Sequence, residues 1–556
     1  MMKFKNLLLL VFIATISVCN AQPNISAKQW QQDLVYLQKL IDADYSGLYS
    51  QINKEDFHKS VEALYQKIPQ LSENDIMIGF AKLIALFRIG HSGISLSTAM
   101  HGEELKTGFH NLPLNFYLFK DGLYIQAATD EYAEAAGARV LKIGNLRVDK
   151  AIEAIRPVVS IENEQFFKAY GIPLLGSPEV LQSLGIASKG EHIPLLLSKN
   201  GKEFKMKFPV NERYHVPAEY GMVEATEGWT SSRQAGDAPL WLKNLKQPYS
   251  FDYLPNDKAL YVRQNQIRNG HGETIHQFYQ RVFEFTEQNE VDKLILDLRQ
   301  NSGGNNYLNK PAILGLIKSK LNKKGQLFTI IGRRTFSAAQ NLVNELEYYT
   351  ETTFIGEPTA ENVNFWGDVN IEILPNSGLP VRLSFMWWQD LDPRDERLAT
   401  DPEITVEPSF IDYHTNHDPV LAAVLSYKVP DNQLIKGLKE LYAAGKYDKA
   451  EETVRAFVNA EENKSLMKQV ESSLNRLGYE FLDENTDTST AILDLNTRLF
   501  PESANAWDSL GESYLNANEF DKAIACYEKA IALDPNGPTG SHAREVLERI
   551  KMHMGK

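Results

Sequence analysis

A serine that opens a helix, preceded by a glycine-rich turn, carries the strongest chemical signal in this sequence. Residues 294–304 read Leu-Ile-Leu-Asp-Leu-Arg-Gln-Asn-Ser-Gly-Gly, and residues 335–340 read Thr-Phe-Ser-Ala-Ala-Gln. Ser337 follows a predicted strand and begins a predicted helix, which presents its hydroxyl beside the amide of Ala338 at the helix N-terminus. A hydroxyl is a poor nucleophile unless a base and oxyanion donors assist it. The structural alternative is that Ser337 only caps the helix.

Three motifs occur in an order that resembles the C-terminal-processing and tricorn-core serine peptidases, also called tail-specific proteases. They are residues 297–304, 335–340 and 354–359, and the resemblance extends from about His91 to Tyr427. It implies an oxyanion hole formed by the backbone amides of Gly303 or Gly304 and of Ala338. Glycine suits this place because a residue without a β-carbon lets the chain approach a substrate carbonyl closely. A tight turn after a buried strand is the alternative for the two glycines.

The general base divides this family into two branches. One branch uses a lysine about two dozen residues after the serine, but that place holds Glu361 and Asn362, and no lysine occurs between Lys324 and Lys428. The resemblance therefore points to the tricorn-like branch, in which a histidine before the PDZ-like domain is the base. The segment Arg-Ile-Gly-His-Ser-Gly-Ile-Ser at 88–95 places His91 there. A histidine can accept a proton at neutral pH, although an isolated histidine is usually structural.

The third member of the predicted site orients the imidazole. Glu396 precedes Pro402 by six residues, as the glutamate of the tricorn-like branch precedes its Pro-acidic-Ile motif. Asp395 is adjacent, and acids in such a charged run are commonly solvated. In that branch a serine before the histidine relays to the glutamate, whereas here Gly90 precedes His91 and Ser92 follows it. Ser92 is thus the candidate relay, in a displaced position.

The remaining motifs favour structural roles. His414 and His417 have a spacing that a metal could use, but no further ligand set accompanies them, so a loop is expected. Asn269-Gly-His-Gly272 lacks the length and the lysine of a phosphate-binding loop and predicts a turn. Trp387 and Trp388 could line a groove or pack in a core. The sequence predicts no cofactor and no metal.

Several elements must fold together to position these residues. The chain of 556 residues is too long for one hydrophobic core, and its net charge of −14 argues against nucleic acid or an anionic membrane as the main partner. Helical spacing of apolar residues predicts a helical domain over 22–100, and short apolar runs with glycine breaks predict an α+β, PDZ-like domain over 101–210. Alternating strands and helices predict an α/β peptidase core over 211–428, which the resemblance implies is ClpP/crotonase-like.

The two ends of the chain carry further signals. Lys3 and Lys5 followed by an apolar run to Val18 predict a signal peptide over 1–21, with a lipoprotein at Cys19 as the alternative. No later segment approaches a membrane span. Residues 429–556 predict tetratricopeptide repeats. The positions that define this repeat are Trp507, Leu510, Gly511, Tyr514, Ala523, Tyr527, Ala530 and Pro535.

Together these features predict a multidomain α/β protein that is exported to the periplasm or outside the cell. The predicted activity is that of a serine endopeptidase with a Ser337–His91–Glu396 site that cleaves protein or peptide substrates through an acyl-enzyme. The repeats are expected to dock a protein partner. Two alternatives remain. One is a scaffold with a degraded peptidase site that binds peptides or proteins through its PDZ-like and tetratricopeptide repeat modules. The other is an esterase-like hydrolase, which the absence of a Gly-x-Ser-x-Gly motif around Ser337 disfavours.

Overall fold

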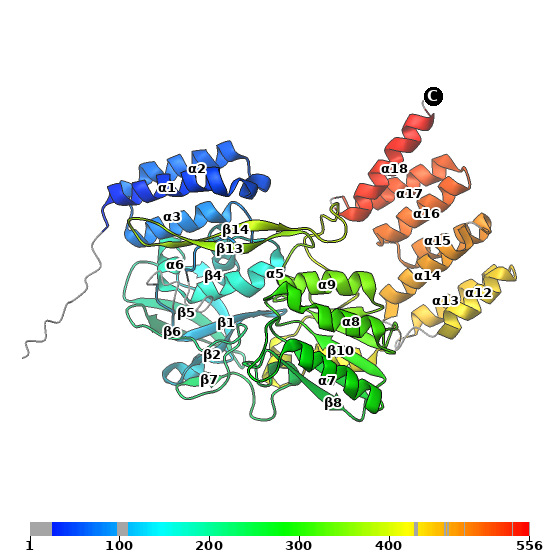
Figure 1. Ribbon diagram of the computed structural model, residues 1–556, viewed down its shortest axis with the longest axis horizontal. Coiled ribbons are helices and arrows are strands. Elements are labelled where there is room, and N and C mark those ends of the chain that lie inside the picture. Colours follow the sequence, from blue (N-terminus) through cyan, green and yellow to red (C-terminus); the bar gives the residue numbers. More distant parts are fainter. Residues whose placement is uncertain are drawn as a thin grey trace, which may run out of the picture.

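The computed structural model of the protein describes residues 25–96, 109–427, 432–460, 463, 466–482, 484–535 and 537–554. The predicted signal peptide and Cys19 lie outside these residues. Figure 1 shows three N-terminal helices above an antiparallel sheet, an α/β core beside that sheet, and a helical array at the C-terminal end. This arrangement confirms the α/β class with C-terminal helical repeats. None of the helices in the described ranges is both long and apolar enough to cross a membrane.

The N-terminal helices are α1 (Ala27–Asp44), α2 (Lys54–Lys67) and α3 (Glu73–Ala85). A capping box between Ser26 and Gln29 starts α1, and the side chain of Ser72 caps α3. Residues spaced one turn apart on α1, among them Leu34 and Ile41, are buried in a core shared with α2, α3 and the antiparallel sheet. The helical prediction for this segment is therefore confirmed.

The antiparallel sheet has seven strands, ordered β1-β2-β3-β5-β6, with β4 on β3 and β7 on β2. The strands are β1 (Leu114–Phe119), β2 (Gly122–Thr129), β3 (Arg139–Ile143), β4 (Leu146–Arg147), β5 (His192–Lys199), β6 (Lys202–Pro209) and β7 (Trp229–Ser231). Short helices α4 (Val148–Ile155), α5 (Glu164–Phe166) and α6 (Pro178–Ser183) connect β4 to β5. Strand β7 lies beyond residue 210, so the segment after the expected boundary still contributes to this sheet. The PDZ-like character of the domain that contains this sheet stays a prediction.

The core sheet has six strands in the order β15-β12-β11-β10-β9-β8, and only β8 runs antiparallel to its neighbour. The strands are β8 (Tyr249–Leu254), β9 (Ala259–Gln264), β10 (Lys293–Asp297), β11 (Leu327–Ile331), β12 (Thr353–Gly356) and β15 (Ile404–Thr405). Helices α7 (Ile275–Gln288), α8 (Lys310–Lys318) and α9 (Ala338–Tyr349) pack on one face, and α11 (Pro419–Ser426), which follows α10 (Phe410–His414), packs on the other. Burial on both faces explains why these strands are almost continuously apolar.

A long hairpin connects the core to the N-terminal helices. Strands β13 (Phe365–Ile373) and β14 (Pro380–Trp388) leave the core after β12 and run beneath α1, α2 and α3 in Figure 1. At its turn, the buried carboxylate of Asp33 accepts hydrogen bonds from the backbone amides of Asn376 and Ser377, at 2.9 and 2.8 Å. Near its base, the indole of Trp366 donates to Ser50 Oγ at 3.1 Å. The hairpin thus ties together segments more than 300 residues apart.

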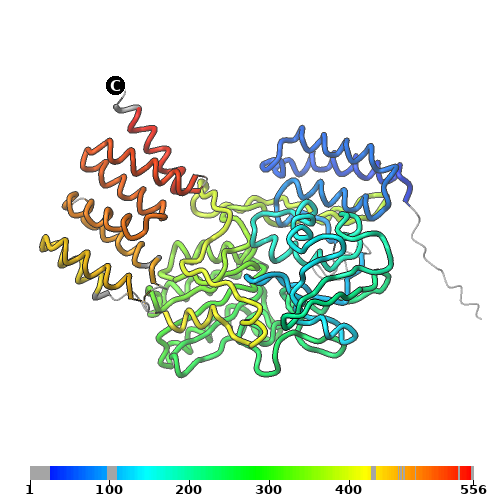
Figure 2. Tube along the Cα trace, turned by 180° about the vertical axis from the view of Figure 1, so that it is seen from behind, coloured from blue at the N-terminus to red at the C-terminus, as the bar shows by residue number. Residues whose placement is uncertain are grey.

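The C-terminal array stacks antiparallel helices into a curved arm that projects from the core in Figures 1 and 2. The helices are α12 (Asn432–Ala443), α13 (Tyr447–Asn459), α14 (Met467–Leu482), α15 (Thr486–Leu499), α16 (Ala504–Asn516), α17 (Phe520–Leu533) and α18 (Pro538–Met554). Small residues allow the helices to approach, because a β-carbon on Gly511 would lie 3.1 Å from the ring of Tyr527. The array has hydrophobic clusters of its own.

Candidate active site

Ser337 occupies a strained turn between β11 and α9. Its backbone has φ 58° and ψ −129°, in a region that residues with a β-carbon rarely adopt. Its side chain makes no capping hydrogen bond to α9, so the capping alternative does not describe this serine. The hydroxyl instead forms a hydrogen bond with His91, and Ser337 Oγ lies 3.0 Å from His91 Nε2. The sequence is thus correct in placing the imidazole beside this hydroxyl.

The imidazole of His91 is fixed on several sides. Its ring stacks on Phe336 at a centroid distance of 4.4 Å and on Phe365 at 5.8 Å. Its loop pairs with β14, since Gly93 and Arg382 exchange backbone hydrogen bonds of 3.0 and 2.9 Å. The guanidinium of Arg382 also donates to the carbonyl of His91 at 3.0 Å. The hairpin therefore holds the histidine loop against the nucleophile.

Ser92 lies beside His91 in the chain but points toward the hairpin. Its buried hydroxyl oxygen accepts a hydrogen bond of 3.0 Å from the backbone amide of Ser384 on β14. This contact fastens the histidine loop to the hairpin. It does not connect His91 with a carboxylate, so the geometry does not support the relay predicted for Ser92.

The carboxylate next to the imidazole belongs to Glu361. Its Oε2 lies 3.4 Å from His91 Nδ1 and accepts a hydrogen bond of 3.1 Å from the backbone amide of Ser337. Glu162 contacts the other side of Glu361 and accepts a hydrogen bond of 2.9 Å from the amide of Gly90. Ser337, His91, Glu361 and Glu162 therefore form one continuous row. Two of its members were not among the predicted site residues.

Burial sets the charges in this row. Desolvation, assisted by the positive charge of Arg382, lowers the pKa of His91 to about 3, so the resting imidazole is neutral. Burial and the neighbouring Glu162 raise the pKa of Glu361 well above its ordinary value. Burial likewise raises the pKa of Glu162, against the lowering effect of its hydrogen bonds. Two adjacent carboxyl groups with raised pKa values favour a shared proton and one negative charge between them.

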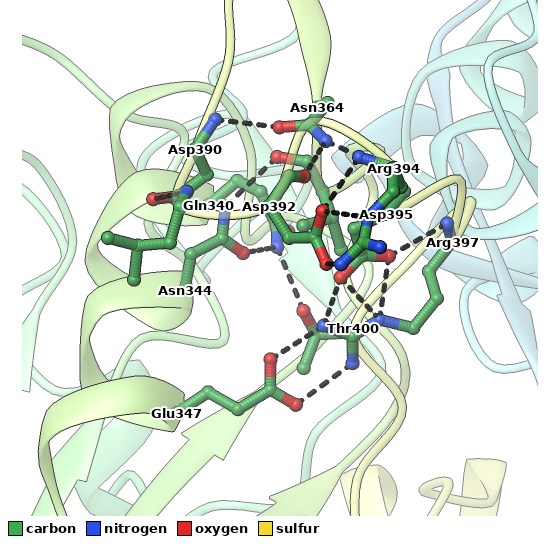
Figure 3. Close-up of polar contacts among 12 residues, drawn as sticks. Gln340, Asn344, Glu347, Asn364, Asp390, Asp392, Arg394, Asp395, Arg397 and Thr400 are labelled. Carbon is green, nitrogen blue, oxygen red and sulfur yellow. Dashed lines mark hydrogen bonds and ion pairs between the residues drawn. The ribbon is translucent and has the colours of Figure 1, made fainter.

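Glu396 does not take the place predicted for it. Its side chain is exposed on the loop that follows β14. Figure 3 shows the contacts that hold this loop: Arg397 forms ion pairs with Asp395 at 2.8 Å and with Glu347 of α9 at 2.7 Å. These contacts anchor the loop to the far part of α9. The spacing to Pro402 contains no information on the direction of the loop, and the structure does not bring Glu396 to the imidazole.

The position of Glu361 in the sequence indicates that its side chain lies near Ser337. It occupies the segment where the other branch of the resembling family has its lysine base. That position projects toward the nucleophile, because the amide of Ala360 donates to the carbonyl of Thr335 at 2.9 Å and holds the two segments side by side. Glu162 had no such signal, since it lies in the loop between the short helix Arg156–Val158 and α5.

The glycine turn lies against the nucleophile. A β-carbon on Gly303 would stand 2.8 Å from Ser337 Cβ, and the φ of this glycine is 96°. The amide of Gly303 donates to Asn301 Oδ1 at 3.0 Å, so this N–H group is not free to bind an oxyanion. The amides of Gly304 and Ala338 donate to no acceptor within the described ranges, and the latter is the first amide of α9. These two N–H groups are therefore the donors available to an oxyanion.

A cavity of about 620 Å³ opens over these groups. Its wall includes His91, Ser337 and Gly304, together with residues of the antiparallel sheet and the hairpin. The site thus lies where the loop after α3, the antiparallel sheet, the hairpin and the core meet. A cavity of this size can enclose several residues of a peptide or an equally large acyl group.

The same acids could also bind a metal. Donor atoms of His91, Glu162 and Glu361 all lie within 4.8 Å of one another. Histidine nitrogens and carboxylate oxygens are both ligands of zinc. In contrast, the two histidines considered from the sequence are engaged singly: His414 Nδ1 contacts the carbonyl of Ser232 at 2.5 Å, and His417 Nδ1 contacts Asp412 at 3.0 Å. They share no site.

Comparisons with known proteins identify the C-terminal repeats. Residues 504–536 match the tetratricopeptide repeat family. Over 83 residues the chain is 29% identical to the chloroplast tetratricopeptide repeat domain-containing protein PYG7 of Arabidopsis thaliana, a match that covers 15% of this chain and 28% of that protein. This part of the chain is therefore a tetratricopeptide repeat, as the sequence predicted.

Three solved structures of peptidases resemble the remainder at low identity. Mature CPAF complexed with lactacystin is 12% identical with a TM-score of 0.49, and the match covers 72% of this chain and 99% of CPAF. The photosystem II D1 C-terminal processing protease is 12% identical with a TM-score of 0.33, over 68% and 93% of the two chains. The tricorn protease is 14% identical with a TM-score of 0.34, over 72% and 36%.

Proposed function

We propose that this protein is a serine peptidase in which Ser337 is the nucleophile, His91 the base and Glu361 the acid that supports the base. The observation that carries the proposal is the 3.0 Å contact between Ser337 Oγ and His91 Nε2, beside two unused amides. A hydroxyl, a neutral imidazole and oxyanion donors are the groups that acyl transfer requires. Glu361 replaces Glu396 in this proposal because it alone of the two contacts the imidazole.

The first chemical step moves one proton and forms one bond. The imidazole takes the proton from Ser337 Oγ while the oxygen attacks the scissile carbonyl, and the amides of Gly304 and Ala338 receive the oxyanion. The imidazolium then gives its proton to the leaving amine, and the C–N bond breaks to leave an acyl-enzyme. Water repeats the sequence, and the ester bond to Ser337 breaks to release the acid.

The carboxyl pair has a defined role in these steps. An imidazolium in this buried pocket is costly, as the lowered pKa of His91 indicates. A single negative charge shared by Glu361 and Glu162, 3.4 Å from Nδ1, offsets that cost. Glu162 is a positioning residue here, since it contacts Glu361 and the amide of Gly90 and does not contact the imidazole hydrogen-bonded to Ser337.

Features outside the four residues of the row support a proposal for the substrate and for the cellular location of the protein. The cavity extends along β13 through Asp368 and Val369, and an extended peptide could add to this strand. The positively charged, apolar start of the chain supports export to the periplasm or beyond. The repeats support docking of a protein partner, and the antiparallel sheet supports a PDZ-like role in peptide binding.

The test is cleavage of an unfolded protein such as casein by the wild type, Ser337→Ala and His91→Ala. We expect cleavage by the wild type and a loss of at least about 1,000-fold in each variant. Equal activity in all three proteins would refute the peptidase, and cleavage of small esters alone would favour an esterase. Binding of peptides without any cleavage would favour the scaffold.

A chelator distinguishes the serine site from a metal site at the same residues. If His91 and the two acids served a bound metal, dialysis against EDTA would abolish cleavage and zinc would restore it. We expect cleavage that resists EDTA and stops when an organophosphonate modifies Ser337. Mass spectrometry of the labelled peptide identifies the modified residue.

A further inference from the structure

Arg334 places an unmatched positive charge in the wall of the active-site cavity. One N–H of its guanidinium donates to the carbonyl of Ala169 at 3.2 Å, and the group lies over the ring of Tyr170, 5.2 Å from its centroid. The other N–H groups have no acceptor among the described residues, and no described carboxylate pairs with this arginine. Burial lowers its pKa, yet a guanidinium remains charged at any physiological pH.

The preceding residue shows what a fully matched arginine looks like in this protein. Arg333 is buried and donates to both carboxylate oxygens of Glu357, to Glu407 at 3.2 Å and to the carbonyl of Leu118 at 2.6 Å. Arg333 thus has two acidic partners, whereas Arg334, which faces the cavity, has none among the described residues. Arg334 is half-buried, and a partly desolvated charge without a counterion is costly, so that such a group is a candidate for binding a ligand.

The charged groups of the cavity wall have an unequal balance. They are Arg334, Arg382 and Asp368. Asp368 is exposed and accepts a hydrogen bond of 3.1 Å from the indole of Trp388, so its carboxylate lies at the rim. Arg334 is thus the arginine of the wall whose positive charge has no carboxylate partner among the described residues, and this charge favours an anionic group on the substrate.

We propose that Arg334 binds a carboxylate of the substrate and thereby selects where the chain is cut. This inference rests on the proposed peptidase function. A guanidinium and a carboxylate match in a bidentate geometry that no other substrate group in a peptide reproduces. Two sources provide this chemistry: an aspartate or glutamate side chain, and the free C-terminus of the substrate.

The chain also limits how far that carboxylate lies from the scissile bond. Arg334 and Ser337 are three residues apart, so their α-carbons are at most about 10 Å from each other. Aromatic contacts link the two positions, because Phe336 packs 5.8 Å from Tyr170 and 4.4 Å from His91. An extended substrate rises about 3.3 Å per residue, which puts the recognised carboxylate within roughly three residues of the cut.

The experiment compares matched peptides that contain one cleavable bond. A glutamate is placed at each position up to three residues on either side of that bond, and each peptide has a partner with glutamine there. Every peptide is made with a free and with an amidated C-terminus. We expect the wild type to prefer one carboxylate position by about 10- to 100-fold in kcat/KM, the effect of one hydrogen bond to a charged group.

The variant Arg334→Gln should abolish this preference, and circular dichroism and thermal unfolding should show that it folds as the wild type does. Arg334→Lys should keep part of the preference. Arg394→Gln is the matched control, because Arg394 is exposed on the loop after β14. Loss of the preference on Glu→Gln exchange identifies a side-chain carboxylate, and loss on amidation identifies the C-terminus. A preference that survives in Arg334→Gln, or no preference in the wild type, overturns the inference and leaves the peptidase proposal intact.

A binding measurement separates the two proposals if no peptide is cleaved. Ser337→Ala and the double variant Ser337→Ala/Arg334→Gln are titrated with fluorescent forms of the same peptides. Tighter binding of the carboxylate peptides to the first protein, lost in the second, supports the role of Arg334 even without catalysis. Equal binding of charged and uncharged peptides to Ser337→Ala refutes it.

Discussion

Single residues at the site are held by contacts that leave them little freedom. The positive φ of Ser337 costs about 1–3 kcal/mol, and the surrounding segments must maintain it. The amide of Ser337 donates to Glu361 at 3.1 Å, so the acid that supports the base also fixes the nucleophile's backbone. One carboxylate therefore has two functions, which makes its replacement informative.

Glu361→Gln should lower kcat by at least about 100-fold, because the amide keeps the shape of the side chain but cannot share a negative charge with Glu162 when His91 becomes an imidazolium. Glu396→Gln is the matched control and should have wild-type kinetics, since its side chain is exposed. Steady-state cleavage of a fluorogenic peptide measures both. The reverse result would restore Glu396 as the third member of the site.

The pH dependence of cleavage should reveal the buried imidazole. A base works in its deprotonated form, and the pKa of His91 is lowered from 6.5 to about 3, so the imidazole stays active at pH values where an exposed histidine is protonated. We expect the acid limb of kcat/KM for an uncharged peptide to lie well below pH 6.5. An acid limb of the kcat/KM profile with its midpoint near pH 6.5 would contradict a buried histidine base.

The same shift has a consequence for stability. The unfolded chain binds a proton at His91 below pH 6.5 and the folded chain does not until about pH 3. This residue therefore makes the protein less stable as the pH falls through that window.

At the scale of elements, the β13–β14 hairpin brings the histidine loop to the core. It contacts α1 through Asp33 at its turn, and the histidine loop through Ser92 and Arg382 along β14. We therefore expect cleavage to depend on Asp33 of α1, which contacts the hairpin at its turn, although this residue is not near Ser337.

Asp33→Ala should destabilise the protein by about 1–3 kcal/mol, because it leaves the partly buried amides of Asn376 and Ser377 without their acceptor. It should also lower kcat by weakening the hairpin that supports His91. Asp44→Ala, an exposed acid on the same helix, is the control. Thermal unfolding and peptide cleavage are measured together, and an effect of equal size in both variants contradicts the role of the hairpin turn.

The elements that the sequence predicted well are those with strong local patterns. Strands β9 to β12 and helix α9 follow the apolar runs and the helix start at Ser337, and the pairing of His91 with Ser337 followed from the order of the motifs. The sequence could not show which acid lies beside His91, because the directions of the loops that carry Glu361 and Glu396 depend on long-range contacts such as that of Arg397 with Glu347. Glu162 reaches the site through tertiary packing of α5, which no spacing pattern encodes.

At the scale of the whole molecule, the hydrophobic cores are separate. One cluster joins the N-terminal helices to the antiparallel sheet, two lie on the faces of the core sheet, and others lie within the repeats. The proposed catalytic row of Ser337, His91, Glu361 and Glu162 lies within residues 91–361. The repeats can therefore lose stability without disturbing the chemistry.

Leu474→Ala should destabilise the repeat array by about 2–5 kcal/mol, since this side chain of α14 is fully buried in the array's own cluster. We expect one unfolding transition to shift while peptide cleavage is unchanged. Leu342→Ala is the counterpart on α9, equally buried behind Ser337, and should shift the other transition and reduce cleavage. Calorimetry resolves the two, and a single transition that moves in both variants contradicts independent cores.

The place of the hairpin in the chain gives the protein an order of assembly. Ser92 and the backbone of Gly93 are fastened by Ser384 and Arg382, which come almost 300 residues later. A polypeptide still emerging from the ribosome lacks that fastening even after its serine, its imidazole and both acids have been made. His91 is therefore held beside Ser337 by the complete set of these contacts only after residue 384 of the 556 has been synthesised, about seven-tenths of the polypeptide.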